Sequence, residues 1–514
     1  MTIAVTTARA KARTVVMSNH ALIVAGSVLL FLPSILFAIA LRPLPAFVTV
    51  AGCCGALALI ASARPEQQGF LARAVDVRRL SLCCLCALAL LILGGELHLV
   101  FTTWDWLTRD AVLADLVHHG FPTGYRIGEN DYLLRAPLGM YMGPALVGRA
   151  FGLLAAHYAL LAQNVLILGA IFYLLISMGE GWGQLVILIL FAGVSIVGAG
   201  LRIAGSLPDA PRFWLLWGLD SWNPMFQYSG TLVQFFWVPN HALPGWWLAA
   251  LVLLQARRQI DVATLGVSMA GALLWSPLCL VAVVPWLAFG AFMRPRDVLL
   301  AGRTWLGTLT AACFLPVLVY LVSGASSIAG GNTYERPDFS FWYMFFVIVQ
   351  LPVLLFLLLV RERIAREDRA PLVASAFVLL ALPLFRFGPN NDLVMRGSIV
   401  ALVIVAFVFG RIVVKATRER SPVAWLGWVL VICSAPSAGV EIGRALATPH
   451  YAVSDCSLME ASRALDETGL PTNYIVPRSL VPGWLLDADK AAFTSPAKRT
   501  CWPDRLPPRY FGTT

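Results

Sequence analysis

Long apolar runs, separated by short polar segments, recur along the whole chain of 514 residues. Many of them approach the roughly 20 residues with which a helix crosses the hydrocarbon core of a bilayer. The pattern therefore predicts an all-α polytopic membrane protein with about thirteen transmembrane helices. We expect these helices near 19–41, 46–63, 80–101, 156–179, 184–204, 242–256, 262–275, 277–293, 304–324, 341–360, 371–386, 397–414 and 422–442.

The short basic loops indicate the orientation, because arginine and lysine are enriched on the cytoplasmic side of membrane helices. These loops are 64–79, 257–258, 294–303, 361–369 and 415–420. All of them lie inside only if the apolar segment 136–152 does not cross the membrane. Its prolines and glycines make it a poor spanning helix, so we expect a helix that lies on the external face.

This topology divides the chain into a transmembrane domain, 1–442, and a small external C-terminal segment, 443–514. Within the domain, 102–155 is the first large external loop, with juxtamembrane helices, and 205–241 is the second. The first apolar run is too long for the core of a signal peptide, so we expect an uncleaved helix. The N-terminus is then cytoplasmic and the C-terminus external.

The composition supports a membrane protein and excludes a nucleic-acid-binding one. Charged residues make up 13% of the chain and hydrophobic residues 59%, whereas soluble domains carry about 25% charged residues. The net charge of +10 is explained by the cytoplasmic loops, since no basic tract is dense enough to indicate nucleic acid.

Cysteines fall into two groups. Eight of the ten lie in apolar runs, where they are expected to act as small hydrophobic residues rather than as metal ligands. Cys456 and Cys501 lie in the polar C-terminal segment. They can pair if that side of the membrane is oxidising, but spacing alone leaves the disulfide open.

The polar stretch that follows the third predicted helix contains the main candidate for chemistry. Asp105 lies between Trp104 and Trp106, and indole rings favour the membrane interface. A carboxylate at headgroup depth, partly shielded from water, is a candidate general base. Asp105 and Arg109 share one face if this stretch is helical, so a helix cap or an ion pair with Arg109 remains an equally open role.

Arginines near the external face are candidates for binding the phosphate of a donor, through forked charge-assisted hydrogen bonds. They are Arg109, Arg135, Arg386 and Arg396. The alternative role is nonspecific contact with lipid headgroups.

Further polar side chains in the external segments are candidates for binding an acceptor or a sugar. They are Asp110, His118, His119, Asp209, Asp220, His241 and Asp392. The aromatic residues around several of them suit a sugar or an interfacial belt equally well, and the two adjacent histidines are a weak metal signal.

The first external loop resembles that of GT-C glycosyltransferases, in the branch of the protein mannosyltransferases and aminoarabinose transferases. The resemblance rests on Asp105 with Arg109, on Gly120-Phe121-Pro122, and on Arg135-Ala136-Pro137-Leu138-Gly139-Met140-Tyr141 followed by Phe151-Gly152. The run from Gly271 to Trp286, split at Ser276-Pro277, is similar to a short helical hairpin of that family. The segment from Asn390 to Arg396 resembles its late external loop.

The resemblance implies an inverting transfer of a sugar from a polyprenyl-phosphate donor to a lipid, glycan or protein acceptor on the external face. Asp105 would be the base, and Arg135 and Arg396 would hold the donor phosphate. A bacterial inner membrane and a role in glycosylation of the cell envelope are expected. No cofactor is implied with certainty, and a divalent cation stays open. The alternatives are a transporter or flippase of lipid-linked glycans and a noncatalytic assembly subunit.

Overall fold

The computed structural model describes residues 17–63, 69–204, 218–293, 295–388, 390–465, 470–487, 491–495 and 499–504. Its α-helices are α1 (Asn19–Ala38), α2 (Pro43–Ala61), α3 (Val77–Leu93), α4 (Trp104–His118), α5 (Met142–Phe151), α6 (Leu153–Met178), α7 (Trp182–Leu190), α8 (Ser195–Ala204), α10 (Thr231–Trp237), α11 (Pro239–Ala256), α12 (Val262–Gly271), α13 (Val283–Met293), α14 (Pro295–Leu299), α15 (Gly302–Ala312), α16 (Leu315–Val322), α17 (Phe339–Gln350), α18 (Pro352–Leu359), α19 (Arg366–Ala381), α20 (Asp392–Gly397), α21 (Ile399–Arg418), α22 (Val423–Ala447) and α23 (Leu458–Leu465). The strands are β1 (Thr123–Ile127), β2 (Asn130–Leu134), β3 (Gly330–Asn332), β4 (Phe385–Phe387), β5 (Ile475–Pro477) and β6 (Ala492–Thr494).

Several helices are long and apolar enough to cross a membrane, as the sequence predicts. In the described ranges there are 6 of them, or up to 8 if each of two bent pairs is one span. They are Asn19–Ala38, Pro43–Ala61, Leu153–Met178, Trp182–Leu201, Ile399–Arg418 and Val423–Ala447, with the bent pairs α15–α16 and α17–α18. The other predicted spans correspond to shorter or more polar helices: α3 has 17 residues and α12 has 10.

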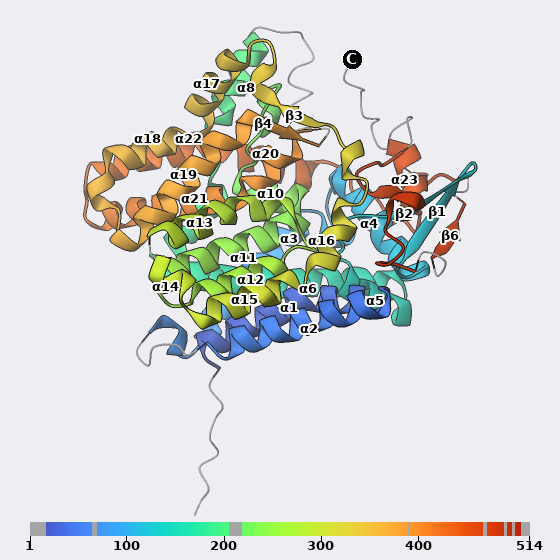
Figure 1. Ribbon diagram of the computed structural model, residues 1–514. Coiled ribbons are helices and arrows are strands. Elements are labelled where there is room, and N and C mark those ends of the chain that lie inside the picture. Colours follow the sequence, from blue (N-terminus) through green and yellow to red (C-terminus); the bar gives the residue numbers. More distant parts are fainter. Residues whose placement is uncertain are drawn as a thin grey trace, which may run out of the picture.

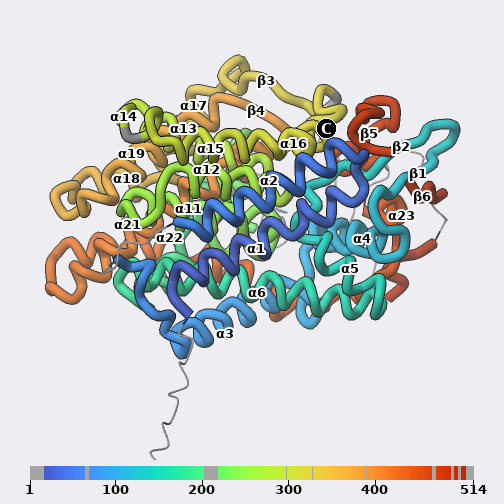
Figure 2. The backbone as a smooth tube through the Cα atoms, turned by 60° about the horizontal axis from the view of Figure 1, so that its bottom comes forward, coloured from blue at the N-terminus to red at the C-terminus, as the bar shows by residue number. Residues whose placement is uncertain are grey.

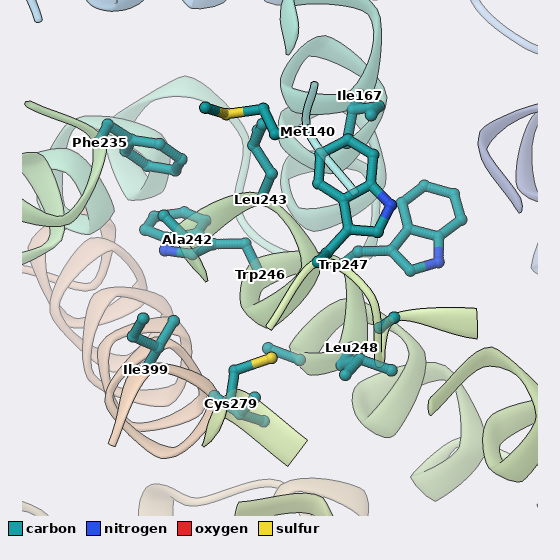
Figure 3. Packing of buried hydrophobic residues seen from close by; sticks show 14 of the residues in the cluster. Met140, Ile167, Phe235, Ala242, Leu243, Trp246, Trp247, Leu248, Cys279 and Ile399 are labelled. Atoms are coloured by element: carbon teal, nitrogen blue, oxygen red, sulfur yellow. The ribbon is translucent and has the colours of Figure 1, made fainter. Parts of the chain in front are cut away.

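The hydrophobic core lies around α11 and α21, whose side chains are buried on nearly every side. These helices pack against each other, and α11 also contacts α6, α12 and α19. Figure 3 shows Trp246 and Trp247 of α11 among Leu243, Ile167 and neighbouring residues. A helix that is apolar on all sides belongs in the interior of a large bundle, so the outer helices shield α11 and α21 from the surroundings.

The fold is mainly helical, consistent with the predicted all-α membrane protein, and contains a small sheet in addition. Four strands pair in the order β5-β2-β1-β6. Strands β1 and β2 form an antiparallel hairpin within segment 102–155, and the C-terminal segment adds β5 antiparallel to β2 and β6 parallel to β1. The C-terminal segment is therefore built into the first loop. In Figures 1 and 2 this sheet and α23 lie at one end of the molecule, and the turn between α18 and α19 lies at the other.

The expected external helix over 136–152 is only partly correct. Helix α5 starts at Met142, and residues 136–141 form an irregular segment that is largely buried, with Leu138 and Met140 fully enclosed. Met140 lies beside the α11 residues in Figure 3. Gly139 allows this close packing, because a Cβ there would lie 2.4 Å from the ring of Trp275. Exposed Leu146 and Phe151 on α5 fit a helix at a membrane surface.

Two other expected features are present in the fold. The apolar run of the expected helical hairpin breaks between α12 and the short 3-10 helix η4 (Leu278–Ala282), around Ser276 and Pro277. The two cysteines of the C-terminal segment form a disulfide, Cys456–Cys501. The disulfide joins the start of α23 to the end of the described chain.

Candidate functional site

Helix α4 carries the first charged pair of the site. Asp105 lies in its first turn, where the helix dipole favours a negative charge, and Arg109 follows one turn later. The Nη2 of Arg109 donates to Oδ2 of Asp105 at 2.9 Å, which confirms that the two residues share a face. Asp105 is 27% exposed, whereas the Arg109 side chain is 2% exposed, so the carboxylate is the accessible half of this pair.

Arg109 keeps donors that no described residue accepts. Within the described ranges its Nε and Nη1 are buried and have no hydrogen-bond partner. A buried guanidinium with unused N–H groups is costly unless something accepts those hydrogen bonds. The arrangement is therefore suited to an anionic ligand that reaches the Asp105–Arg109 pair.

Helix α20 supplies a second ion pair with the same spacing. The Nη2 of Arg396 lies 3.1 Å from Oδ1 of Asp392, and the Nε of Arg396 is buried without a partner. Burial raises the pKa of Asp392; Arg396 opposes that rise, and the Asp105 carboxylate adds to it. This interaction between Asp105 and Asp392 indicates that the two ion pairs lie close together, although 287 positions separate the residues along the chain.

Two buried tyrosines lie near these two ion pairs. Burial raises the pKa of Tyr474, whose ring also experiences the charges of Arg109, Asp105, Arg396 and Asp392. Burial likewise raises the pKa of Tyr141, with Arg109 as the main opposing charge. The C-terminal segment therefore brings Tyr474 to the residues of α4 and α20. Sequence reasoning gave neither tyrosine a role in the site. Tyr141 ends the motif that resembles the GT-C loop, whereas no local pattern marks Tyr474.

Arg135 is attached to this group through the backbone. Its N–H donates to the carbonyl of Tyr474 at 2.6 Å, and its guanidinium donates to the carbonyls of Leu321 and Thr472 at 3.5 and 3.3 Å. The Nε is buried and unpaired. Within the described ranges no carboxylate forms an ion pair with Arg135, so it is a buried cation without a compensating anion.

His241 lies at the edge of the same group. Its Nδ1 lies 2.6 Å from the hydroxyl of Ser276, at the break before η4, and its imidazole experiences the charges of Arg396 and Arg109. The predicted hairpin and the start of α11 therefore both border the site.

Asp110 is held in a buried network with two histidines, and its role in sugar binding stays a prediction. Its Oδ2 lies 2.6 Å from Nε2 of His98, and its Oδ1 lies 3.9 Å from Nδ1 of His157. His98 in turn binds the carbonyl of Tyr451 at 2.8 Å. These three side chains form a buried network between α4, α6 and the C-terminal segment. The sequence contained a signal for it, because His98 and His157 lie in apolar surroundings.

His118 and His119 lie at the far end of α4 and are exposed. Thirteen residues of helix separate His118 from Asp105, or about 20 Å at 1.5 Å per residue. These histidines therefore lie outside the group around Asp105, and their contact with an acceptor stays a prediction.

Asp220 is also a structural residue rather than a free ligand. Its buried carboxylate accepts hydrogen bonds from the hydroxyls of Ser195 and Ser437 and from the N–H of Gly230, at 2.5 to 2.7 Å.

Two further residues complete the predicted set. Arg386 lies in strand β4, where its backbone pairs with Gly331 of β3. Asp209 lies outside the described residues.

Asp115 fastens the C-terminal segment to α4. Its Oδ2 accepts hydrogen bonds from the Tyr125 hydroxyl at 2.6 Å and from the Leu458 N–H, at the start of α23, at 2.9 Å. Burial raises the pKa of Asp115 to about 7; the two hydrogen bonds oppose the rise, and Glu460 adds to it.

We expect docking of α23 to weaken as pH rises. Undocking exposes the carboxyl to water and shifts its pKa from about 7 towards the ordinary value of 3.8, so between these two values the docked state binds more of the proton than the undocked state. The docking free energy should therefore fall as pH rises through that window, by at most about 1.4 kcal/mol per pH unit, and level off above it. Hydrogen exchange of α23 amides, corrected for intrinsic rates, measures this. Asp115→Asn should remove the slope, and an unchanged slope in that variant would contradict the assignment.

Within the residues that the structure describes, no three His, Cys, Asp or Glu side chains lie close enough to hold a metal ion. A divalent cation at Asp105 or Asp392 would therefore need further ligands from a substrate, such as phosphate oxygens.

The side chains of the site determine which chemistry it can support. Buried arginine donors can bind a phosphate, and a partly exposed carboxylate can accept a proton from a neighbouring hydroxyl.

Comparison with protein-family models, with curated proteins and with solved structures finds no match for this chain.

Proposed function

We propose that this protein is an inverting glycosyltransferase that uses a polyprenyl-phosphate sugar on the external face of a bacterial plasma membrane. The observation that carries the proposal is the set of buried, unused donors on Arg109 and Arg396 beside the accessible carboxylate of Asp105. Arg135, which also keeps a buried, unused donor, is linked to this group through the backbone of Tyr474. Buried N–H groups of this kind need a hydrogen-bond acceptor, and a lipid phosphate reaches a membrane-embedded site without a nucleotide. The proposal includes the thirteen-helix topology and the GT-C relationship that the sequence predicts.

The chemistry assigns one role to each group. The acceptor hydroxyl attacks the anomeric carbon of the sugar, and its proton passes to Asp105. The bond from the anomeric carbon to the phosphate oxygen breaks, and polyprenyl phosphate leaves with the electron pair. Arg109 and Arg396 balance the negative charge that develops on that oxygen. Attack from the side opposite the leaving group inverts the anomeric configuration.

A transporter of lipid-linked sugars is the second candidate. It is favoured by the buried network of His98, Asp110 and His157 together with Glu96, whose carboxylate accepts a hydrogen bond from Asn164 at 2.9 Å. Buried acids and histidines near membrane helices often form proton paths in transporters. The enzyme is preferred because Asp105 lies among the unused arginine donors, whereas the network lies on the other side of α4.

The test is release of polyprenyl phosphate. Purified protein in lipid nanodiscs is supplied with polyprenyl-phosphate sugars that differ in the sugar, together with an extract of cell-envelope acceptors. The enzyme should release polyprenyl phosphate from one donor class in proportion to the acceptor glycosylated. Movement of intact lipid-linked sugar across vesicles without release would identify a transporter, and neither activity would favour an assembly subunit.

A further inference from the structure

A cavity of about 580 Å³ lies at the other end of α21 from the candidate site. Asp392 and Arg396 precede the first residue of α21, whereas Lys415 and Arg418 in its last turns line the cavity. A helix of 20 residues is about 30 Å long. The cavity therefore lies near the opposite face of the membrane-spanning region, beside the turn between α18 and α19 (Figure 2).

Ion pairs build the frame of this cavity. Asp368 is buried and accepts hydrogen bonds from Arg257 at 2.6 Å and from Arg411 at 2.8 Å. Arg418 binds Glu180 at 2.5 Å. These contacts join α11, α19, α21 and the turn before α7. Because the pairs link several helices, the walls of the cavity are held in place.

The basic groups of the cavity exceed its acidic groups. Six arginines and lysines and four carboxylates line it. Four of the six basic residues are paired with carboxylates, namely Arg363, Arg411, Lys415 and Arg418. Arg366 and Arg369 remain. Within the described ranges neither forms an ion pair, and the only hydrogen bond from either runs from Arg369 to the carbonyl of Ile364 at 3.3 Å.

The position of these two arginines suits a phosphate. They are three residues apart at the start of α19, so they lie on one face of that helix. Guanidinium groups bind phosphate oxygens through forked hydrogen bonds. Val408 and Ile412 of the membrane-spanning helix α21 form an apolar wall of the same cavity. A ligand that has both a phosphate and an acyl chain would contact both surfaces.

We propose that this cavity binds the phosphate headgroup of an anionic phospholipid, with Arg366 and Arg369 as the residues that contact it. The inference is independent of the proposed transferase function. It assigns the site to the face opposite the candidate active site, where basic pockets between membrane helices commonly hold anionic lipids.

The test compares two double variants. Arg366→Ala/Arg369→Ala removes the unpaired charges from the cavity. Arg361→Ala/Arg420→Ala removes two exposed charges from the loops beside it, outside the cavity lining. Native mass spectrometry measures the affinity of purified protein for phosphatidylglycerol and phosphatidylcholine. Thermal unfolding checks that both variants fold, as expected for exposed arginines.

The cavity variant should lose about tenfold or more in affinity for phosphatidylglycerol, while the control changes by less than about twofold. Phosphatidylcholine should bind more weakly and be indifferent to both variants. Equal losses in the two variants would reveal general attraction to basic loops and overturn the site. Wild-type affinity in the cavity variant would overturn it as well. If inorganic phosphate displaces the lipid completely and binds as tightly alone, the ligand is a free anion and the lipid assignment fails.

Discussion

Replacing Asp105 with Asn is expected to reduce turnover by about a hundredfold or more, which is the usual contribution of a general base. The amide keeps the size of the side chain and an oxygen that can accept from Arg109 Nη2, at 2.9 Å in the protein. It cannot take a proton from an acceptor hydroxyl. The measurement is the rate of sugar transfer at saturating donor, with donor affinity measured separately.

Donor affinity should change little in Asp105→Asn, because the proposed phosphate contacts come from arginines. Asp131→Asn is the matched control, since Asp131 lies in the β1–β2 hairpin and pairs with Arg126. Its turnover should equal that of the wild type. Full activity in Asp105→Asn would return Asp105 to the simpler role of a first-turn residue that pairs with Arg109.

Replacing Arg396 with Ala is expected to weaken donor binding first. The change removes a charge-assisted contact of about 1.5–3 kcal/mol, which corresponds to a loss of roughly ten- to a hundredfold in affinity. It also leaves the carboxylate of Asp392 buried without its partner at 3.1 Å. Equilibrium binding of a polyprenyl-phosphate sugar measures the effect.

Arg396→Lys separates the two consequences of that change. Lysine keeps a positive charge for Asp392 but cannot form the forked contact of a guanidinium, so folding should be retained and affinity should stay below wild type. Arg126→Ala, in the exposed hairpin, should bind the donor normally. Wild-type affinity in Arg396→Ala would remove Arg396 from the donor site.

A transporter would respond differently to the same variants. Binding and transport would fall together in Asp105→Asn and in Arg396→Ala, without a selective loss of transfer. The contrast between turnover in one variant and affinity in the other is therefore the most direct way to distinguish the two functions.

Local patterns in the sequence were sufficient to predict several helices that are long and apolar enough to cross a membrane, and one ion pair. Apolar runs of bilayer length predict spanning helices because burial in lipid depends mainly on composition. The Asp105–Arg109 pair was predictable because its two members lie one helical turn apart. The break at Ser276-Pro277 was also predictable from local sequence, because proline interrupts a helix at its own position.

The tertiary structure alone decided which distant residues meet. Leu133 pairs with Val476 in the sheet. This pairing positions the C-terminal segment so that Tyr474 lies near the charged residues of α4 and α20. Nothing near Tyr474 in the sequence marks that position, because strand pairing depends on a partner hundreds of residues away. Asp110 likewise resembled a free site residue until the fold placed His98 and His157 beside it. The sequence by itself determined the class of protein and the local charge pairs. The assembly of the site depended on packing between segments far apart in the chain, and such packing leaves no periodic pattern in the sequence.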